Sequence, residues 1–165
     1  MKTIANDLKH SGSQLGIIFK SLERLFDQAI DVKLFTLMEL DHDQNIVWRS
    51  YSNMPDAYPI LGKKSWLRNE WSDIIERQQK TFVANSIEEI AKVFPDSELI
   101  RSLGCESCLN LPIFINGKIR GTVNCLHEAG HFTLERVIAA ESLKSAGALA
   151  FLIAKNIRYR GERDE

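Results

Sequence analysis

The chain has 165 residues, of which 44% are hydrophobic and 26% are charged, and its formal net charge is −1 at pH 7. This length predicts one domain that buries about 70% of the surface its unfolded chain would expose. The balanced charge argues against a strongly basic nucleic-acid-binding surface and against an acidic solvating tail.

The first part of the chain predicts a helix followed by a hairpin. Residues 14–30 place apolar side chains at helical spacing, which is typical of an amphipathic helix. The β-like runs 32–40 and 46–52 flank a polar cluster and predict two strands joined by a turn. Two prolines then indicate a loop over 53–64.

The middle of the chain predicts short elements. Tryptophan and isoleucine side chains at helical spacing favour a helix over 65–80. Ser86 and Glu89 form a capping-box pattern, Asp96 is a further N-cap candidate, and Gly104 is placed to end a helix. In chain order, the other expected elements are a strand over 81–84, a helix over 87–94 and a helix over 97–103.

The last part of the chain predicts a second hairpin and a long helix. Apolar strands over 107–115 and 118–127 are joined by the Asn-Gly pair at 116–117, which is the preferred sequence of a type I′ turn. Thr133 is the expected N-cap of a final helix over 134–157.

This order of elements predicts an α+β architecture built on an antiparallel sheet. Both strands of the second hairpin are apolar on both faces, so each face of the sheet must be covered. We expect the long terminal helices on one face and the short helices and loops, over a pocket, on the other.

From residue 98 onward the sequence contains four short motifs in a fixed order: Leu111-Pro112-Ile113, Gly117-Lys118, Gly121-Thr122 and Phe132-Thr133-Leu134-Glu135. In this order they resemble the pattern of a GAF domain, and the resemblance extends over about residues 14–157. Upstream, Trp71 and the run 82–85 lie where GAF domains often have a helix and a short third strand.

The resemblance implies a profilin-like sheet of five or six antiparallel strands with a ligand pocket on one face. It also implies a pair of helices, from the two termini, that often dimerises. GAF domains bind cyclic nucleotides, bilins, haem and other small molecules, and most are fused to an output domain. We expect a single GAF-like domain over 1–165, with a core over 14–157 and a charged tail over 158–165.

Residues 127–131 read HEAGH, which matches the HExxH motif of zinc peptidases. In those enzymes the two histidines lie one turn apart on a helix, with the glutamate as base. Here His127 ends a predicted strand, Gly130 interrupts the motif, and the next helix begins after Thr133. We therefore interpret the motif as a polar strand end, and we expect neither a metal nor a cofactor.

The cysteines offer a redox hypothesis. If the Asn-Gly turn has two residues, Ile115 pairs with Lys118, and counting back pairs Cys108 with Cys125 at a site where side chains are closest. A bulge would break this register. Cys105, just past a helix end, is the better candidate for an accessible thiol, whereas buried free cysteines are commonly core residues. The cysteine pattern matches neither the GAF methionine sulfoxide reductases nor a bilin attachment site.

A pocket needs a few polar groups among apolar walls. Asn110 and Asn124 interrupt apolar strands, where an unpaired amide costs about 1–3 kcal/mol. The same register places these two amides on opposite faces, so they cannot both line one pocket. Each candidate also has a structural explanation, because buried polar groups are usually satisfied. The candidate pocket residues are Tyr51, Tyr58, Trp66, Trp71, Asn85, Phe94, Glu98, Cys105, Ser107 and Asn124.

The sequence also carries information on the cellular compartment of the protein. Its longest apolar run, residues 146–154, is too short to span a bilayer, and the N-terminal residues lack the apolar segment of a secretory signal. Three cysteines without zinc-type spacing are typical of a reducing cytoplasm. We expect a cytoplasmic protein that contacts neither nucleic acid nor membrane.

These observations favour a stand-alone regulatory domain, not an enzyme, that binds a small molecule and forms a homodimer through its N- and C-terminal helices. The alternative is a thiol-based redox sensor or small reductase that uses Cys105 with Cys108 or Cys125. A third hypothesis is a structural dimerisation module whose pocket has collapsed.

Overall fold

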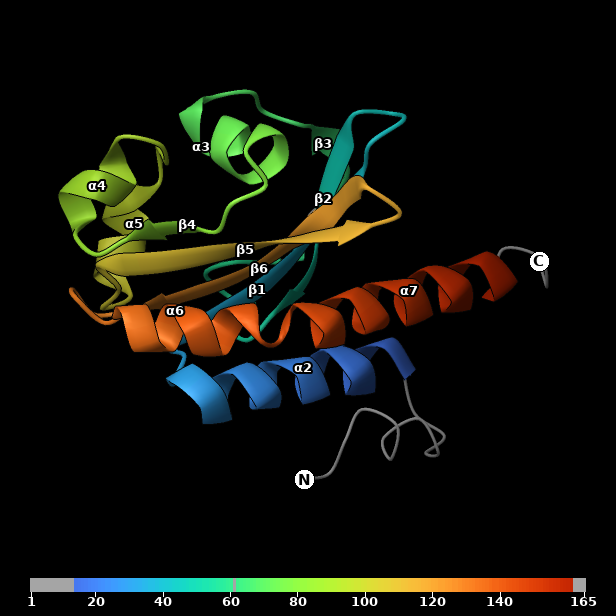
Figure 1. Ribbon diagram of the computed structural model, residues 1–165, viewed down its shortest axis with the longest axis horizontal. Helices are drawn as coiled ribbons and strands as arrows, with labels where there is room; N and C mark the ends of the chain where they lie inside the picture. The colour runs from blue at the N-terminus through green and yellow to red at the C-terminus, as the bar shows by residue number, and fades with distance from the viewer. Residues whose placement is uncertain (1–13, 61, 162–165) are drawn as a thin grey trace.

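The chain folds around one six-stranded antiparallel sheet. The computed structural model describes residues 14–60 and 62–161 (Figure 1). The strands are β1 (Leu34–Asp41), β2 (Ile46–Ser52), β3 (Lys64–Ser65), β4 (Phe82–Ala84), β5 (Ser107–Ile115) and β6 (Lys118–His127). They lie in the order β3-β2-β1-β6-β5-β4. The predicted α+β class and the antiparallel sheet of five or six strands are therefore confirmed.

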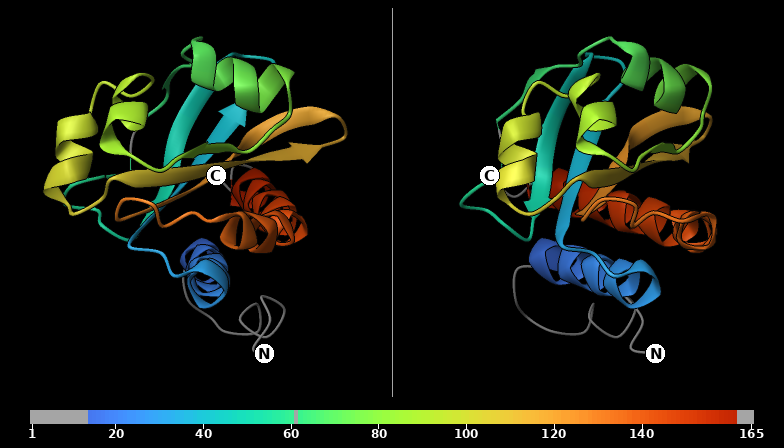
Figure 2. Two further views of the ribbon diagram at one scale, coloured as in Figure 1. Left: turned by 60° about the vertical axis from the view of Figure 1, so that its left-hand side comes forward. Right: turned by 90° about the vertical axis from the view of Figure 1, so that its left-hand side faces the viewer.

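Helices cover both sides of this sheet (Figure 2). They are α2 (Gln14–Ile30), α3 (Glu70–Ser72), the π-helix η1 (Asp73–Arg77), α4 (Ile87–Ala91), α5 (Ser97–Ser102), α6 (Leu134–Glu141) and α7 (Lys144–Gly161). We call the side under α2, α6 and α7 the helix face and the side under α3, η1, α4 and α5 the lid face. Apolar cores lie on both, with Phe35 and Leu109 on the helix face and Leu34 and Cys108 on the lid face.

The N-terminal helix forms over the predicted residues because its apolar stripe matches the helix face. Ile18, Leu22 and Phe26 are each fully buried in α2. Fully burying a side chain of this size contributes about 1.5–3 kcal/mol, so the stripe outweighs the modest helix propensity of its branched and aromatic members. The ring of Phe26 lies 5.7 Å from that of Phe35 on β1.

The helix predicted over 65–80 is wrong at both ends. Ser65 pairs with Ile46 as part of β3, and the helix begins only after Asn69, whose side chain forms a reciprocal capping box with Ser72. The capping box satisfies the free backbone N–H groups of the first turn, which fixes the start of the helix there. After α3 the backbone widens into η1, where Gln78 N–H donates to Asp73 O.

The final helix is broken where one continuous helix was predicted. The Ser142 hydroxyl donates to the carbonyl of Ala139 at 2.6 Å, and such side-chain back-bonding bends helices. The axes of α6 and α7 differ by 41°. The helix also continues past the predicted end, and Arg158 in the expected tail donates to Glu39 on β1 at 2.6 Å; residues 162–165 of that tail lie outside the described residues.

The described helices include none that is individually long and apolar enough to cross a bilayer, although α6 and α7 taken together reach the required length and composition across their bend.

The β5–β6 hairpin contains the bulge that would break the predicted register. Its turn is as expected, with positive φ at Asn116 and Gly117 and Ile115 opposite Lys118. Beyond Phe114 the pairing shifts by one residue, so that Arg120 is the extra residue on β6. All pairs farther from the turn differ from the prediction by one position, and this shift determines which side chains meet on the lid face.

Candidate functional site

A chain of polar side chains crosses the lid face through three neighbouring strands. The indole N–H of Trp71 donates to Asn110 Oδ1 at 2.9 Å, Asn110 Nδ2 donates to Asn124 Oδ1 at 2.9 Å, and Asn124 Nδ2 donates to Thr36 Oγ1 at 3.2 Å. The direction is fixed chemically, because an indole N–H can only donate. We call these four residues the amide chain.

The shifted register makes the amide chain possible. Asn110 lies directly opposite Asn124, and Asn124 lies opposite Thr36. The expectation that the two amides occupy opposite faces is therefore wrong. Paired residues share a face of the sheet, and their Cβ atoms lie about 4.5–5.5 Å apart, within reach of a side-chain hydrogen bond.

Aromatic side chains cover the amide chain. The ring of Trp71 lies 5.3 Å from Trp66 and 5.5 Å from Phe94, and Phe94 lies 6.2 Å from Phe82. We call these four residues the aromatic lid. Within the aromatic lid, the Trp66 ring is held to η1 by its indole N–H, which donates to Glu76 Oε2 at 3.1 Å. Three of the predicted pocket residues, Trp66, Trp71 and Phe94, thus lie together, and Trp71 joins them to the amide chain at Asn110.

One buried hydroxyl beside the amide chain has no partner. Thr122 lies two residues before Asn124 on β6, on the same face, and is completely buried. Its Oγ1 makes no hydrogen bond within the described residues. An unpartnered buried hydroxyl costs about 1–3 kcal/mol, so the lid face holds more hydrogen-bonding capacity than its own side chains use.

A charged cluster lies at the side of the lid face. Tyr58 donates to Asp96 Oδ2 at 2.5 Å, and the Arg49 guanidinium lies 4.8 Å from the centre of the Tyr58 ring. Burial lowers the pKa of Arg49, and burial followed by the Asp96 contact raises the pKa of Tyr58. Asp96 occupies the N-cap position of α5 without a side-chain cap bond, because its carboxylate serves Tyr58 instead.

Five predicted pocket residues lie away from the amide chain. Tyr51 packs on the helix face, where it donates to Glu23 and contacts Phe19 and Phe35. Burial, followed by the hydrogen bond to Glu23, raises the pKa of the Tyr51 phenol. The other four are Asn85, which bonds both backbone polar groups of Phe132; Ser107, which donates to Glu128 O; Glu98, which is exposed; and Cys105, which is buried against α5.

The sequence-based candidates omit Phe82 of the aromatic lid and both threonines of the site. Thr36 and Thr122 are ordinary β-branched residues in apolar strands, and nothing in the local pattern separates them from packing residues. Asn110 was noticed but assigned to the wrong face. Gly121 was the available signal, since an isolated glycine in a strand often marks a bulge.

All three cysteines are buried thiols. Cys108 lies opposite Leu126 and Cys125 opposite Leu109, so the predicted pairing of Cys108 with Cys125 is wrong, and the two belong to cores on opposite faces. Cys105, expected to be accessible, is fully buried. Burial raises the pKa of Cys105, raises that of Cys108 to about 12, and raises that of Cys125 still more clearly. Such thiols are poor nucleophiles at neutral pH.

The HExxH motif lies at a strand end and in a turn, as expected, and not on a helix. The rings of His127 and His131 are stacked face to face, 3.7 Å apart with planes 13° from parallel. The lone pair of an imidazole nitrogen lies in the plane of its ring. Because the two rings are stacked and nearly parallel, their lone pairs lie in separate parallel planes and do not point at one shared metal ion. Within the described ranges, no group of three or more His, Cys, Asp or Glu side chains could hold a metal ion.

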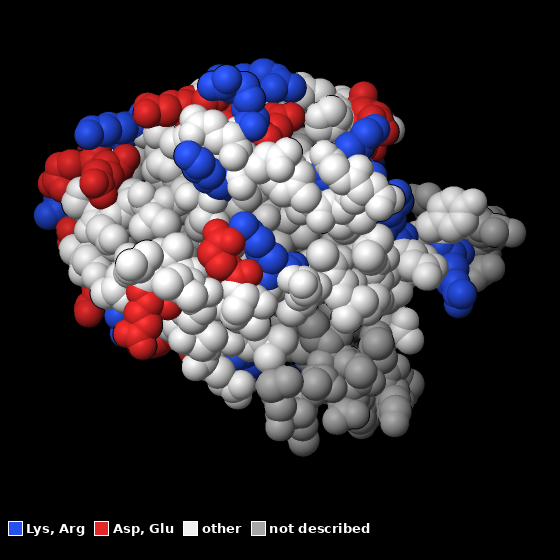
Figure 3. Space-filling view, in the orientation of Figure 1, with Lys and Arg blue, Asp and Glu red and all other residues white. Residues whose placement is uncertain are grey.

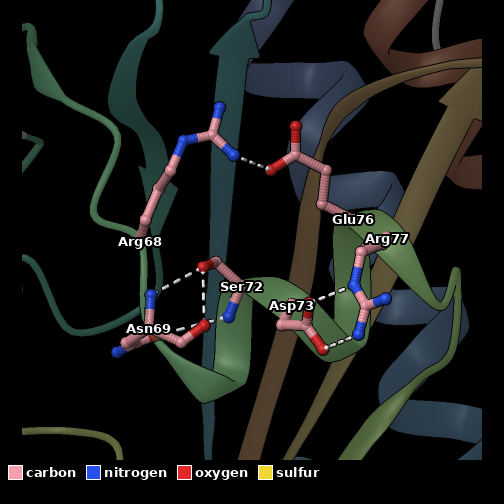
Figure 4. Close-up of a pocket in the computed structure, with 6 residues that line it drawn as sticks. All are labelled: Arg68, Asn69, Ser72, Asp73, Glu76 and Arg77. Carbon is pink, nitrogen blue, oxygen red and sulfur yellow. Dashed lines mark hydrogen bonds and ion pairs between the residues drawn. The ribbon is translucent and has the colours of Figure 1, made fainter.

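An open depression of about 560 Å³ lies outside the aromatic lid, beside α3 and η1 (Figure 4). Its charged groups pair with one another: Arg68 with Glu76 at 3.3 Å, and Arg77 with Asp73. The hydrogen bond from Arg77 lowers the pKa of Asp73 to about 2. Its remaining lining residues, Asn69 and Ser72, satisfy each other in the capping box. The depression therefore offers little free hydrogen-bonding capacity, in contrast to the lid face.

No family model and no curated protein matches the sequence. Among solved structures, the GAF domain/HD domain protein from Geobacter sulfurreducens has a TM-score of 0.68 at 12% identity, covering 89% of this chain and 95% of that one. The GAF domain of a two-component sensor histidine kinase from Bacillus halodurans has a TM-score of 0.64 at 18% identity, covering 91% and 99%. The GAF domain from a phosphoenolpyruvate-protein phosphotransferase of Coxiella burnetii has a TM-score of 0.65 at 15% identity, covering 93% and 92%.

These similarities each cover about nine tenths of this chain and more than nine tenths of the chain compared. They therefore bear out the resemblance noted from the sequence. The chain has the fold of a GAF domain.

Proposed function

We propose that this chain is a cytoplasmic sensory or regulatory domain that binds a small molecule without transforming it. The amide chain carries the proposal: three polar side chains of neighbouring strands, Thr36, Asn124 and Asn110, are joined in line across the buried lid face and linked to Trp71 on α3. A purely structural sheet gains little from such residues, because apolar pairs of similar size would be about as stable. Sensor histidine kinases among the proteins of similar fold support a signalling role.

The ligand would contact the amide chain from beside the aromatic lid, because Trp71 belongs to both groups and bonds Asn110 directly. The groups available there are amides and hydroxyls, so the part of the ligand that meets the sheet is uncharged and both donates and accepts hydrogen bonds. The buried hydroxyl of Thr122 adds one unused partner. The neighbouring aromatic rings of Trp66, Trp71 and Phe94 favour a ligand with an aromatic or apolar planar part. Arg49, at the side, suits a carboxylate or phosphate substituent.

Native mass spectrometry of freshly purified protein, compared with the denatured mass, tests this proposal. We expect a discrete non-covalent adduct on wild-type protein. Asn110→Ala and Asn124→Ala should each lose the adduct, whereas Gln28→Ala, which removes an exposed amide on α2, should keep it. Circular dichroism confirms that each variant is folded. A bare wild-type protein that no member of a planar-heterocycle library shifts in thermal unfolding would contradict the proposal.

We further propose that the chain acts as a homodimer through its C-terminal helix pair. Five large apolar side chains on α6 and α7 are between 47% and 77% exposed. From Ile138 onward, together with the exposed Ser142, Ser145 and Asn156, they follow the alternating spacing of four and three residues that is typical of a helix–helix seam. Figure 3, in the orientation of Figure 1, shows largely uncharged surface over these helices. The five apolar residues, which we call the seam, are Leu134, Ile138, Leu149, Leu152 and Tyr159.

The charges beside the seam favour an antiparallel partner. Every charged residue of α7 is basic, whereas α6 has a net negative charge, with Glu135 and Glu141 against Arg136. Parallel pairing would place Lys155 and Arg160 beside the same residues of the partner, and antiparallel pairing would place them near its acidic end. By contrast, the exposed positions of α2 include Lys20, so the seam does not extend onto that helix.

Light scattering at micromolar concentration tests the dimer. We expect wild-type protein at twice the mass of one chain. The double substitution Leu149→Lys with Leu152→Lys should give a monomer, because it buries two lysines against a partner. Leu67→Lys, at a residue 64% exposed before α3, is the matched control and should remain a dimer. A monomeric wild type or a dimeric double variant would contradict this proposal.

A further inference from the structure

The stacked histidine pair joins two parts of the fold that are distant in sequence. His131 Nε2 lies 2.7 Å from Ile30 O and 2.8 Å from Asp31 O, at the C-terminal end of α2. Carbonyl oxygens only accept, so Nε2 carries a proton and donates to both. His131 thereby satisfies a backbone carbonyl that the end of a helix leaves free. His127, at the end of β6, stacks on its ring.

The surroundings of the pair favour the neutral form of the His127 imidazole. Its Nδ1 is buried and has no hydrogen-bond partner within the described residues. A protonated imidazole carries hydrogen on both ring nitrogens, so protonation would place a donor on Nδ1 where no acceptor lies. It would also place a positive charge against the His131 ring, which is only 7% exposed.

The surrounding charges act in both directions. Asp31, on the α2–β1 connection, favours protonation of His127, because its Oδ2 lies 3.6 Å from His127 Nε2. Glu128, in the turn, also favours protonation of His127. Lys33, which leads into β1, and His131 both disfavour protonation of His127. On α6, Arg136 donates to His131 O at 2.9 Å and adds a further positive charge near the pair.

We propose that the His127–His131 stack is a proton-operated joint, which fastens the C-terminal end of α2 to the β6–α6 turn while His127 is neutral and releases it when His127 is protonated. On release the His127 ring turns toward Asp31 and solvent, and His131 loses the neighbour that holds it against the α2 carbonyls. The joint needs no ligand on the lid face, so it stands apart from the proposed small-molecule site.

The direction of the pH effect follows from linkage. Burial, followed by the neighbouring His131 ring, lowers the pKa of His127 below its ordinary value of 6.5. The unfolded or opened chain therefore takes up the proton more readily than the closed joint. The stabilisation from the joint is complete above the ordinary pKa and is lost progressively as the pH falls below it.

Amide hydrogen exchange on the full chain tests the joint. Two reporter amides close the α2–β1 connection: Asp31 N–H, which donates to Asp27 O, and Lys33 N–H, which donates to Leu126 O. After correction for intrinsic exchange chemistry, we expect their protection to fall roughly fivefold or more between about pH 7.5 and about pH 5.5. Amides in the middle of α7 should keep their protection, which separates local opening from global unfolding.

Substitutions identify the group that titrates. His127→Phe keeps an aromatic ring in the stack without a titratable nitrogen, so it should abolish the pH dependence of the reporter amides. If His127→Phe does not fold, His127→Gln replaces it in the same experiment. His42→Gln removes an exposed histidine of the β1–β2 turn and should behave as wild type. Equal reporter protection at both pH values in wild-type protein, or an undiminished pH dependence in the folded His127 variant, would overturn the proposal.

Discussion

Replacing Asn110 with alanine should lower the free energy of unfolding by about 2–5 kcal/mol. The substitution removes both hydrogen bonds that Asn110 makes in the amide chain, to Trp71 and to Asn124. Asn124 is buried, so its Oδ1 would lose its donor with no water to replace it. Urea unfolding followed by tryptophan fluorescence measures the loss, and Trp71 itself should report the change in its surroundings.

The control for this prediction removes both ends of the central hydrogen bond. The double variant Asn110→Leu with Asn124→Val leaves no orphaned amide, although the Trp71 indole N–H and Thr36 Oγ1 still lose their partners. It should therefore recover part of the stability lost in Asn110→Ala. If it does so while losing the adduct, the amides are retained for binding. A loss below about 1 kcal/mol in Asn110→Ala would show that the amide chain is not formed in solution.

Those parts of the fold that depend on local patterns were predictable from sequence. The apolar stripe of α2, the type I′ turn at 116–117 and Gly104, with φ +73° at the end of α5, each involve neighbouring residues alone. The Ser86 hydroxyl likewise accepts from Glu89 N–H as predicted. The Glu89 carboxylate, however, accepts from the backbone N–H of Asn85 and not from that of the cap residue Ser86.

The predictions that failed depend on contacts between distant segments. A tryptophan spacing that fits a helix also fits an extended segment and a short helix, and β3 forms there because it can pair with β2. Similarly, Ser142 breaks the final helix although serine is tolerated in many helices. In both cases the local pattern is compatible with two structures, and tertiary packing selects between them.

The candidate site was only partly predictable for a related reason. A one-residue shift in register exchanges the faces of every side chain beyond it, so the unseen bulge at Arg120 was enough to misplace Asn110 and to pair the wrong cysteines. Trp71 and Asn124 were identified because aromatic and amide side chains are unusual enough to notice. The hydroxyls of Thr36 and Thr122 can be identified as site groups only from their neighbours in the folded sheet, which the local sequence does not reveal.

The register that aligns the amide chain depends on Gly121, next to the bulge. Gly121 has φ +154°, and a Cβ built there would lie 2.0 Å from Met38 O and 2.9 Å from the Phe151 ring. The first of these contacts is with backbone of the neighbouring strand, which cannot rotate away as a side chain can. We therefore expect Gly121→Ala to lower the free energy of unfolding by about 3–5 kcal/mol, the range of the severe single substitutions.

Two glycine controls separate close packing from backbone conformation. Gly117→Ala, at φ +72° in the open turn, should cost about 1–2 kcal/mol from the left-handed conformation alone. Gly62→Ala, which meets no atom within 4 Å, should change stability by no more than about 0.5 kcal/mol. Urea unfolding of the three variants gives the ranking. A Gly121→Ala protein as stable as Gly117→Ala would contradict the close approach of β1 and β6.

Gly121→Ala also tests whether fold and site are linked through this register. A protein that relieves the clash by slipping one residue at the bulge would separate Asn110 from Asn124, because their pairing lies on the far side of it. Cross-strand contacts between the two side-chain amides, observed by NMR in the folded fraction of the variant, distinguish the outcomes. If the contacts persist, the strand has bent locally. If they disappear while the sheet remains, the same single glycine that closes β1 against β6 also aligns the proposed binding site.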